Sequence, residues 1–154
     1  MIAVDANLLV YATVPIDQRH DAAREWLDGA IDGPTPVAMP WESLVAFLRV
    51  VTNPRVFNPP AAMVDALDQV ARWLASPNVW TPTPTSQHGR YVAELITQHN
   101  LASNDVHDAH LAALAISHGL QVASHDSGFA RFPAARWFDP LADGTVFGTT
   151  STKG

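Results

Sequence analysis

The sequence predicts an α/β fold whose short, mostly parallel sheet is covered by helices on both faces. Short apolar segments alternate along the chain with longer segments of helical periodicity, which is typical of parallel sheets. The apolar segments are continuous and not alternating, as expected of strands buried on both faces. A chain of 154 residues can bury one substantial core. We therefore expect a single domain over residues 1–141, followed by a flexible tail over 142–154.

The first half of the chain begins with the apolar run MIAVD, a predicted strand, and continues as ANLLVYA, a predicted helix. Glycine and proline in DGPTP end the second helix, and Pro40 opens the third, because its missing N–H costs nothing in a first turn. The predicted strands of this half are 1–5 and 35–39, and the predicted helices are 6–12, 20–31 and 41–51.

The second half starts after a proline-rich loop, TNPRVFNPP. The helix that follows is amphipathic, with Met63, Leu67, Val70 and Leu74 on one stripe. Gly119 is expected to end the last long helix as its C-terminal cap. The predicted helices of this half are 61–75, 86–100 and 103–119, and the predicted strands are 78–82, 120–124 and 135–139.

Composition limits the possible functions. The chain has no cysteine, so any metal must be held by carboxylate or imidazole groups. It contains neither an apolar run of membrane-spanning length nor a signal peptide, and we expect a soluble, cytoplasmic protein. The formal charge of -6 argues against non-specific binding to nucleic-acid phosphates, unless several carboxylates share a site that a cation neutralises.

Three acidic residues follow predicted strands. Asp5 ends the first strand, Glu42 comes shortly after the second, and Asp126 follows the strand over 120–124. Because the carboxyl ends of parallel strands meet at one edge of a sheet, these carboxylates are expected to lie together. Each has a simpler alternative: Asp126 can be a turn residue, and Glu42 can interact with the dipole of a helix start.

Asp108 is the fourth candidate. On its helix the neighbours at i+3, i+4 and i+7 are Leu111, Ala112 and Ala115, so its face is apolar and its carboxylate should be largely buried. Such a charge needs a cation or hydrogen-bond donors, and an arginine or a backbone cap is the simpler possibility. Asp105, one turn earlier, is explained equally well by the helix start.

Carboxylates that converge raise one another's pKa, and a hard divalent cation relieves the repulsion. Oxygen ligands suit Mg²⁺ or Mn²⁺ better than Zn²⁺. A water bound to such a cation can attack a phosphodiester. The acids therefore predict a metal-dependent hydrolase acting on nucleotide bonds.

Four segments taken together, MIAVDANLLVYA, WESLVAFLRVVTNPRVF, VHDAHLAALAISHGL and ASHDSGFARFPAARWFDPL, resemble the PIN-domain ribonuclease toxins of the VapC family. The resemblance extends over residues 1–141. It implies a PIN-like fold with strand order 3-2-1-4-5, Mg²⁺- or Mn²⁺-dependent endoribonuclease activity, a homodimer and a VapB-type antitoxin partner from a toxin–antitoxin pair.

The resemblance also implies site residues by position. The metal-binding and catalytic acids are Asp5, Glu42, Asp108 and Asp126, with Asn7 and Ser124 as polar supports. Many relatives have another acid shortly after the last one, where this chain has Ser127 and Gly128. A second cation would therefore depend on Asp105.

The motifs HDAH and SHD suggest an alternative, a metal-dependent HD-type phosphohydrolase with His107 and His125 as ligands. That fold is expected to be all-helical, whereas LQVASHD reads as a strand, and His107 should point about 100° away from Asp108 on a helix. Of the histidines, His110 is the one expected nearest the pocket. Trp41, beside Glu42, could line a groove.

RNA binding needs positive charge, and Arg55 and Arg131 are the candidates for phosphate contacts. Nine Lys and Arg residues in total predict weak general affinity, with selectivity for single-stranded loops or shape. Two further alternatives remain open. A catalytically silent PIN interaction module would have lost an acid, and a nuclease acting on DNA would be expected to carry a broader basic surface.

Overall fold

The computed structural model describes residues 1–142, and the predicted tail from residue 143 onward lies outside the described residues. Its centre is a five-stranded parallel sheet in the order β3-β2-β1-β4-β5. The predicted α/β class and strand order are confirmed. The strands are short: β1 Ile2–Val4, β2 Val37–Ala38, β3 Val79–Trp80, β4 Gln121–Ala123 and β5 Trp137–Phe138.

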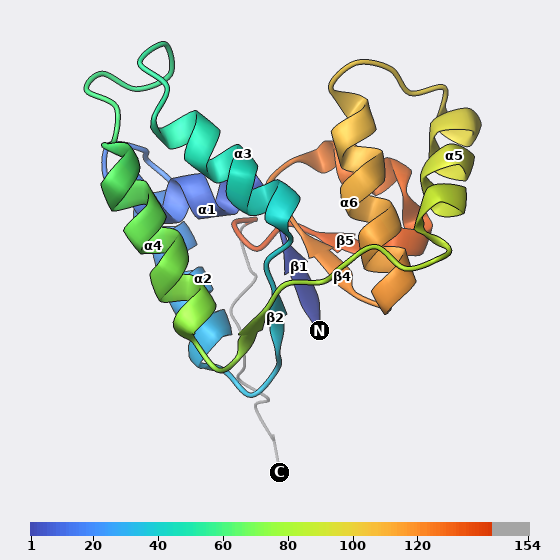
Figure 1. The fold of residues 1–154 in the computed structure, drawn as a ribbon, viewed down its shortest axis with the longest axis horizontal. Coiled ribbons are helices and arrows are strands. Elements are labelled where there is room, and N and C mark those ends of the chain that lie inside the picture. Colours follow the sequence, from blue (N-terminus) through green and yellow to red (C-terminus); the bar gives the residue numbers. More distant parts are fainter. Residues whose placement is uncertain (143–154) are drawn as a thin grey trace.

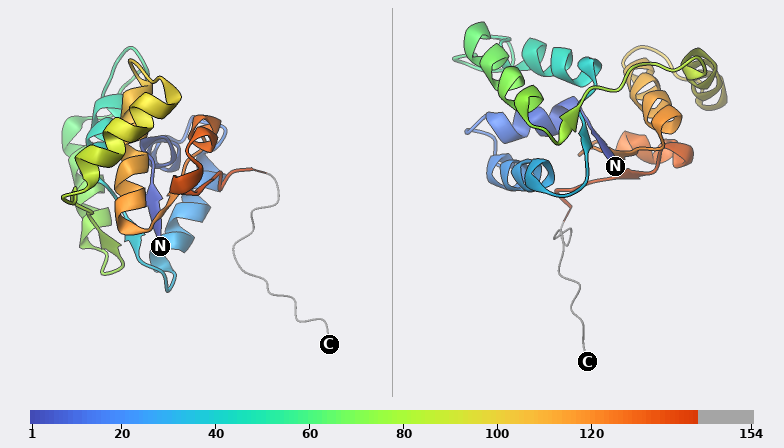
Figure 2. Two further views of the ribbon diagram at one scale, coloured as in Figure 1. Left: turned by 90° about the vertical axis from the view of Figure 1, so that its right-hand side faces the viewer. Right: turned by 60° about the horizontal axis from the view of Figure 1, so that its bottom comes forward.

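In the part of the chain that the structure describes, six α-helices cover the two faces of the sheet (Figure 1). The first four lie on one side of the sheet, and α5 and α6 lie on the other, where they pack against each other (Figure 2). Each predicted helix is present within two residues at either end. The helices are α1 Ala6–Thr13, α2 His20–Asp32, α3 Trp41–Val51, α4 Met63–Ala75, α5 His88–His99 and α6 Asp105–His118.

Consecutive residues of the central strands point into two separate cores. Val4 and Val37 belong to the core under the first four helices, whereas Ala3 and Ala38 belong to the core under α5 and α6. This burial on both faces explains why the strands read as continuous apolar runs. Because all pairings are parallel, the segments after β1, β2 and β4 start from the same edge of the sheet.

Local signals set several helix ends. Asp5 caps α1, and its Oδ1 accepts a 2.7 Å hydrogen bond from the Ala6 N–H. Pro40 directly precedes α3, and Gly119 ends α6 at φ 64°, as predicted. Two 3₁₀ helices, Ser127–Arg131 and Pro133–Ala135, were not predicted.

The predicted stripe on α4 is only partly buried. The buried side chains of this helix are Ala66, Val70 and Trp73, whereas Met63 and Leu67 are each 49% exposed. The helix is therefore rotated relative to the stripe, so that Trp73 packs edge-on against Phe47 in the core, with ring centroids 5.0 Å apart. Within residues 1–142, no helix has the length and apolar character needed to cross a membrane.

Candidate active site

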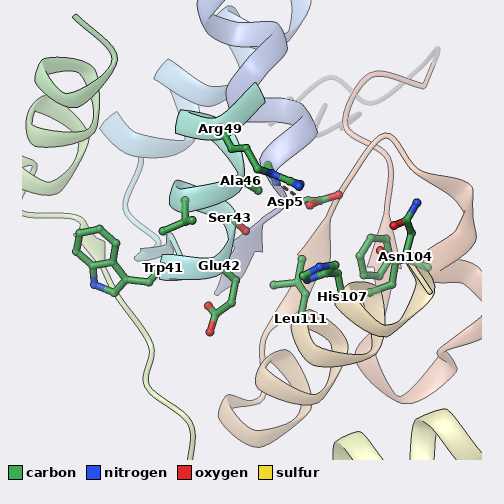
Figure 3. A pocket seen from close by; sticks show the side chains of 13 residues that line it. Asp5, Trp41, Glu42, Ser43, Ala46, Arg49, Asn104, His107 and Leu111 are labelled. Atoms are coloured by element: carbon green, nitrogen blue, oxygen red, sulfur yellow. Dashed lines mark hydrogen bonds between the residues drawn. The ribbon is translucent and has the colours of Figure 1, made fainter. Parts of the chain in front are cut away.

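A pocket of about 860 Å³ opens where α1, α3 and α6 meet (Figure 3). The β1–α1 junction contributes Asp5, and α6 contributes Asp108. Glu42, Val45, Ala46 and Arg49 line the pocket from α3, where their spacing of three and four residues places them on one helix face. The complete lining is Asp5, Ala6, Trp41, Glu42, Ser43, Val45, Ala46, Arg49, Asn104, His107, Asp108, Leu111 and Phe129.

Asp5 is held by a small polar network beneath the pocket. The hydroxyl of the buried Ser124 donates a 2.6 Å hydrogen bond to Asp5 Oδ2 and accepts one of 3.0 Å from Asn7 Nδ2. It also accepts a hydrogen bond from the Asp126 N–H at 3.0 Å. The single hydroxyl therefore uses its donor and both acceptor sites, and it fixes Asp5 relative to the segment that carries Asp126.

Asp5, Asp108 and Asp126 are electrostatically coupled. Burial, followed by the charges of Asp126 and Asp5, raises the pKa of Asp108 to about 6, while Arg131 opposes this increase. Burial also raises the pKa of Asp5, against the lowering effect of the Ser124 and Ala6 hydrogen bonds. The charge of Asp126 therefore adds to the effect of burial at both Asp5 and Asp108.

Asp126 also does what a turn residue does. Its Oδ1 accepts a 2.7 Å hydrogen bond from the Gly128 N–H and caps the 3₁₀ helix Ser127–Arg131. A Cβ at Gly128 would lie 2.7 Å from Arg131 Nη2 and 2.9 Å from Asp126 Oδ1, so a larger residue here would displace these two side chains. The turn and the acidic cluster are thus two roles of one exposed side chain.

Glu42 lines the same pocket but is not brought into this cluster. Its Oε1 accepts a 2.6 Å hydrogen bond from His110 Nε2, and in Figure 3 its side chain points away from Asp5. Glu42 is absent from the charges that raise the pKa of Asp5 and Asp108. Of the four predicted acids, Asp5, Asp108 and Glu42 line the pocket and Asp126 does not; the charge of Asp126 acts on Asp5 and Asp108, whereas Glu42 lies on the α3 wall.

Asp105 and Arg131 form an ion pair at the edge of the acidic cluster. Arg131 Nη1 lies 3.2 Å from Asp105 Oδ2, and Nη2 lies 3.8 Å from Asp108 Oδ2. Its Nε donates a 2.7 Å hydrogen bond to the Gly128 carbonyl. Arg131 thus acts as a counter-charge for two acids, and Asp105 is already engaged by it.

The predicted RNA contact at Arg55 is not placed at the pocket. Arg55 is exposed in the loop after α3, and it is absent from the pocket lining. The basic side chain that does line the pocket, Arg49, was missed by sequence reasoning. It lies seven residues after Glu42, and this helical spacing was the available signal.

The histidines are distributed differently from the HD-type alternative. His107 lines the pocket together with Asp108; the two are consecutive residues of α6, and the pocket takes in side chains about 100° apart around the helix. His110 approaches the pocket as predicted, through Glu42. His125 instead pairs with Asp139, its Nδ1 lying 2.9 Å from Oδ2.

The donor chemistry of the aspartate cluster fits a hard divalent cation, because Asp5, Asp108 and Asp126 offer only oxygen atoms. Burial is the main cause of the raised pKa values of Asp5 and Asp108, the charge of Asp126 adds to it, and a cation would favour the ionised form of both groups. Within residues 1–142, however, no three Asp, Glu or His side chains are already arranged as a metal-binding group. Cation binding would therefore require these side chains to move closer together.

Comparisons with known proteins give a consistent result. A family model for the PIN domain matches residues 2–135. Ribonuclease VapC37 of Mycobacterium tuberculosis is 41% identical over 142 residues, which cover 92% of this chain and 99% of that protein. Ribonuclease VapC33 of the same organism is 34% identical over 143 residues, covering 93% of this chain and all of the relative.

Solved structures with the same fold are more distant in sequence. The VapC20 toxin of M. tuberculosis, described as cleaving the sarcin-ricin loop, aligns with a TM-score of 0.65 at 20% identity, covering 84% of this chain and 93% of that one. The Rickettsia felis VapBC2 structure, bound to a DNA fragment from its promoter, aligns with a TM-score of 0.64 at 17% identity, covering 90% and 98%. At such low sequence identity, these alignments show only that the fold is shared.

Proposed function

This chain belongs to the PIN-domain family, and from that premise we propose that it is a Mg²⁺- or Mn²⁺-dependent endoribonuclease, the toxin of a toxin–antitoxin pair. The observation that carries the proposal is that Asp5 and Asp108 line one open pocket and both have a pKa raised by burial and by the neighbouring charge of Asp126. Strongly perturbed carboxyl groups in a cleft are typical of catalytic sites.

Asp5, Asp108 and Asp126 would hold the cation. When bound, it would supply a water of lowered pKa and neutralise charge on the scissile phosphate. Ser124 keeps Asp5 in a fixed orientation through its 2.6 Å hydrogen bond, and Asn7 supports that serine. Phe129 and Leu111 belong to the apolar part of the lining, together with Ala6, Val45 and Ala46, and these side chains limit the water around the reacting groups.

The pocket also offers groups suited to single-stranded RNA. Trp41 is 51% exposed beside Glu42, and an exposed indole provides a surface on which a base can stack. Arg49 lines the same pocket and forms no ion pair within residues 1–142, so its guanidinium is available to contact a phosphate. RNA that presents unpaired bases is therefore the proposed substrate.

The toxin role rests on the relatives. Curated relatives carry the name ribonuclease VapC, and solved structures of the same fold include VapBC2 and FitAcB. An acidic pocket in a chain with a formal charge of -6 complements a small basic antitoxin with an arginine or lysine that reaches the carboxylates. The proposal includes a homodimer. The exposed apolar side chains Met63, Val64 and Leu67 of α4 would form part of its interface.

Two alternatives predict a different outcome when the protein meets nucleic acid. A silent module of this fold would bind its partner without cleaving, and a nuclease for DNA would use the same acids. The match to the PIN domain over residues 2–135 contradicts the HD-type alternative. Incubation of the Mn²⁺-loaded protein with structured RNA, single-stranded DNA and duplex DNA separates the remaining possibilities. Cleavage of RNA alone supports the proposal, whereas cleavage of DNA or of nothing contradicts it.

A further inference from the structure

Arg19 and Tyr11 form a stacked pair outside the pocket described above. The guanidinium carbon of Arg19 lies 3.8 Å from the centroid of the Tyr11 ring. On another side the Tyr11 ring meets His125 edge-on, with ring centroids 5.9 Å apart. Tyr11 belongs to α1, Arg19 directly precedes α2, and His125 follows β4. None of the three lines the pocket, and we refer to the first two as the Arg19–Tyr11 stack.

The guanidinium of this stack is held in a fixed plane. Its Nε and Nη2 each donate a 2.7 Å hydrogen bond to the Asp17 carboxylate, which also accepts from the Arg19 N–H at 2.8 Å. Within residues 1–142, Nη1 has no such partner, and the Arg19 side chain is 35% exposed. Because Tyr11 covers one face and Asp17 covers one edge, the opposite face and Nη1 are left for a ligand.

The stack lies beside the acids of the candidate site. Asn7 and Tyr11 are four residues apart on α1 and share a helix face. Asn7 Oδ1 accepts a 3.4 Å hydrogen bond from the His125 N–H, and the next residue is Asp126. Burial raises the pKa of Tyr11, and the charges of Asp5 and Asp126 contribute to this increase. The phenol is therefore within electrostatic range of both carboxylates.

The acids thus border two different surfaces. Asp5 lines the pocket that also contains Trp41 and Arg49, and its charge reaches Tyr11 as well. Asp126 does not line the pocket, and it adjoins the stack through its neighbour His125. An endonuclease has to hold nucleotides on both sides of the phosphate that it cleaves, and the pocket provides contacts on one side only.

A nucleobase suits the stack better than a phosphate does. The charge of Arg19 is compensated by Asp17, and the nearby Asp5 and Asp126 disfavour a second anion. A planar guanidinium presents a surface on which a base can stack. Ile16, 79% exposed just before Asp17, adds apolar surface in the same turn.

We propose that the Arg19–Tyr11 stack is a second base-binding subsite, on which an unpaired nucleobase of the RNA stacks beside the acids and outside the pocket that contains Trp41. The inference rests on the proposed ribonuclease function and extends it, because it places RNA on both sides of the acids. Arg19 and Tyr11 have no part in cation binding.

The test measures RNA binding by fluorescence anisotropy in EDTA, so that neither cation nor cleavage is needed. The probes are a labelled single-stranded RNA and a set of RNAs in which one nucleotide at a time is abasic. Loss of the base that stacks on Arg19 should weaken binding by wild type about tenfold. Arg19→Ala should weaken binding of the intact RNA about tenfold and add no further loss on that abasic RNA. Trp41→Ala should show the same coupling with a different nucleotide.

Two conservative variants separate stacking from charge and from folding. Arg19→Lys retains the positive charge beside Asp17 but lacks the planar face, so it should bind as weakly as Arg19→Ala. Tyr11→Phe retains the ring under the guanidinium and should bind within threefold of wild type. Arg24→Ala is the matched control, because Arg24 also pairs with an acid, Asp28, on the exposed side of α2, and it should leave the affinity unchanged.

The outcomes distinguish this inference from the function on which it rests. Full affinity in Arg19→Lys would assign Arg19 to a phosphate and overturn the base subsite. Coupling of Arg19 and Trp41 to the same nucleotide, or of Arg19 to none, would also overturn it while RNA binding itself stands. If wild type binds no RNA, the proposed function fails and the subsite fails with it.

Discussion

Ser124 Oγ donates a 2.6 Å hydrogen bond to Asp5 Oδ2 across a separation of 119 residues in sequence. This contact joins the ends of β1 and β4, which pair directly in the sheet. The hydroxyl also accepts from Asn7 and from the Asp126 N–H. Two of the three grouped aspartates are therefore positioned through one buried serine.

The first prediction concerns this serine. Ser124→Ala leaves the Asn7 amide and the Asp126 N–H without their acceptor, and the free energy of unfolding should fall by about 1–3 kcal/mol. The pKa of Asp5 should rise further, because the Ser124 hydrogen bond lowers it. RNA cleavage should slow by about 10–100-fold. Urea denaturation and cleavage rates measure both effects.

Ser117→Ala is the matched control, because Ser117 Oγ donates a hydrogen bond to the Ala113 carbonyl within α6. Its cleavage rate should equal that of wild type. Equal cleavage by the Ser124 variant would remove Ser124 from the site.

The second prediction concerns pH and the metal-free protein. The pKa of Asp108 in the folded state is about 6, against an ordinary value of 3.8. Between these values the folded state binds more protons than the unfolded state, so stability falls as pH rises through 6. Asp108→Asn abolishes this contribution. The variant should therefore gain about 1 kcal/mol relative to wild type between pH 5 and pH 7.5 in EDTA.

Thermal and urea melts at the two pH values measure this difference, and Asp68→Asn on the exposed face of α4 provides the control. A constant difference between wild type and Asp108→Asn would show that Asp108 has an ordinary pKa.

The third prediction concerns the counter-charge. Arg131 lies 3.2 Å from Asp105 and 3.8 Å from Asp108, so a cation approaching these acids competes with its guanidinium. Arg131→Gln should tighten Mn²⁺ binding at pH 7.5 by about threefold, within the modest range expected for partly exposed ion pairs. Calorimetric titration of Mn²⁺ measures the change, and Arg90→Gln on α5 serves as the control. Weaker Mn²⁺ binding by the Arg131 variant would contradict the competition.

The fourth prediction concerns RNA contacts, measured as fluorescence anisotropy of a labelled single-stranded RNA in the Asp5→Asn background. Trp41→Ala should weaken binding by about tenfold, whereas Trp41→Phe should retain it, because stacking needs only an aromatic face. Arg49→Gln should reduce the slope of log affinity against log salt by about one phosphate contact. Arg55→Gln should change neither quantity, because this side chain lies outside the pocket. An unchanged affinity in Trp41→Ala would assign the exposed indole to another partner.

The elements of the fold were predictable because their signals are local. Continuous apolar runs identified the strands, and Pro40 and Gly119 marked helix ends that the structure confirms. The rotation of α4 was not predictable from its apolar stripe. The core takes in Trp73 and leaves Leu67 half-exposed. This choice depends on the contact of Trp73 with Phe47, which belongs to another helix, α3.

The candidate site was predictable only in part. Acids at the ends of parallel strands were expected to share an edge, and Asp5 and Asp126 do so with Asp108. The orientation of Glu42 depends on His110, 68 residues away, and on His88 behind it. The pairing of Arg131 with Asp105 depends on the 3₁₀ helix after β4. Neither contact has a periodic or local signature in the sequence.

The central claim is that the grouped aspartates form a cation-dependent site for RNA cleavage. The most direct measurement is the rate of RNA cleavage by wild type and Asp5→Asn, first in EDTA and then with excess Mn²⁺ restored. We expect wild type to cleave only after Mn²⁺ is restored. Asp5→Asn should cleave at least about 100-fold more slowly under the same conditions, because it removes a ligand of the cation that activates the water. Cleavage at full rate in EDTA, or equal rates for the two proteins with Mn²⁺, would contradict the claim.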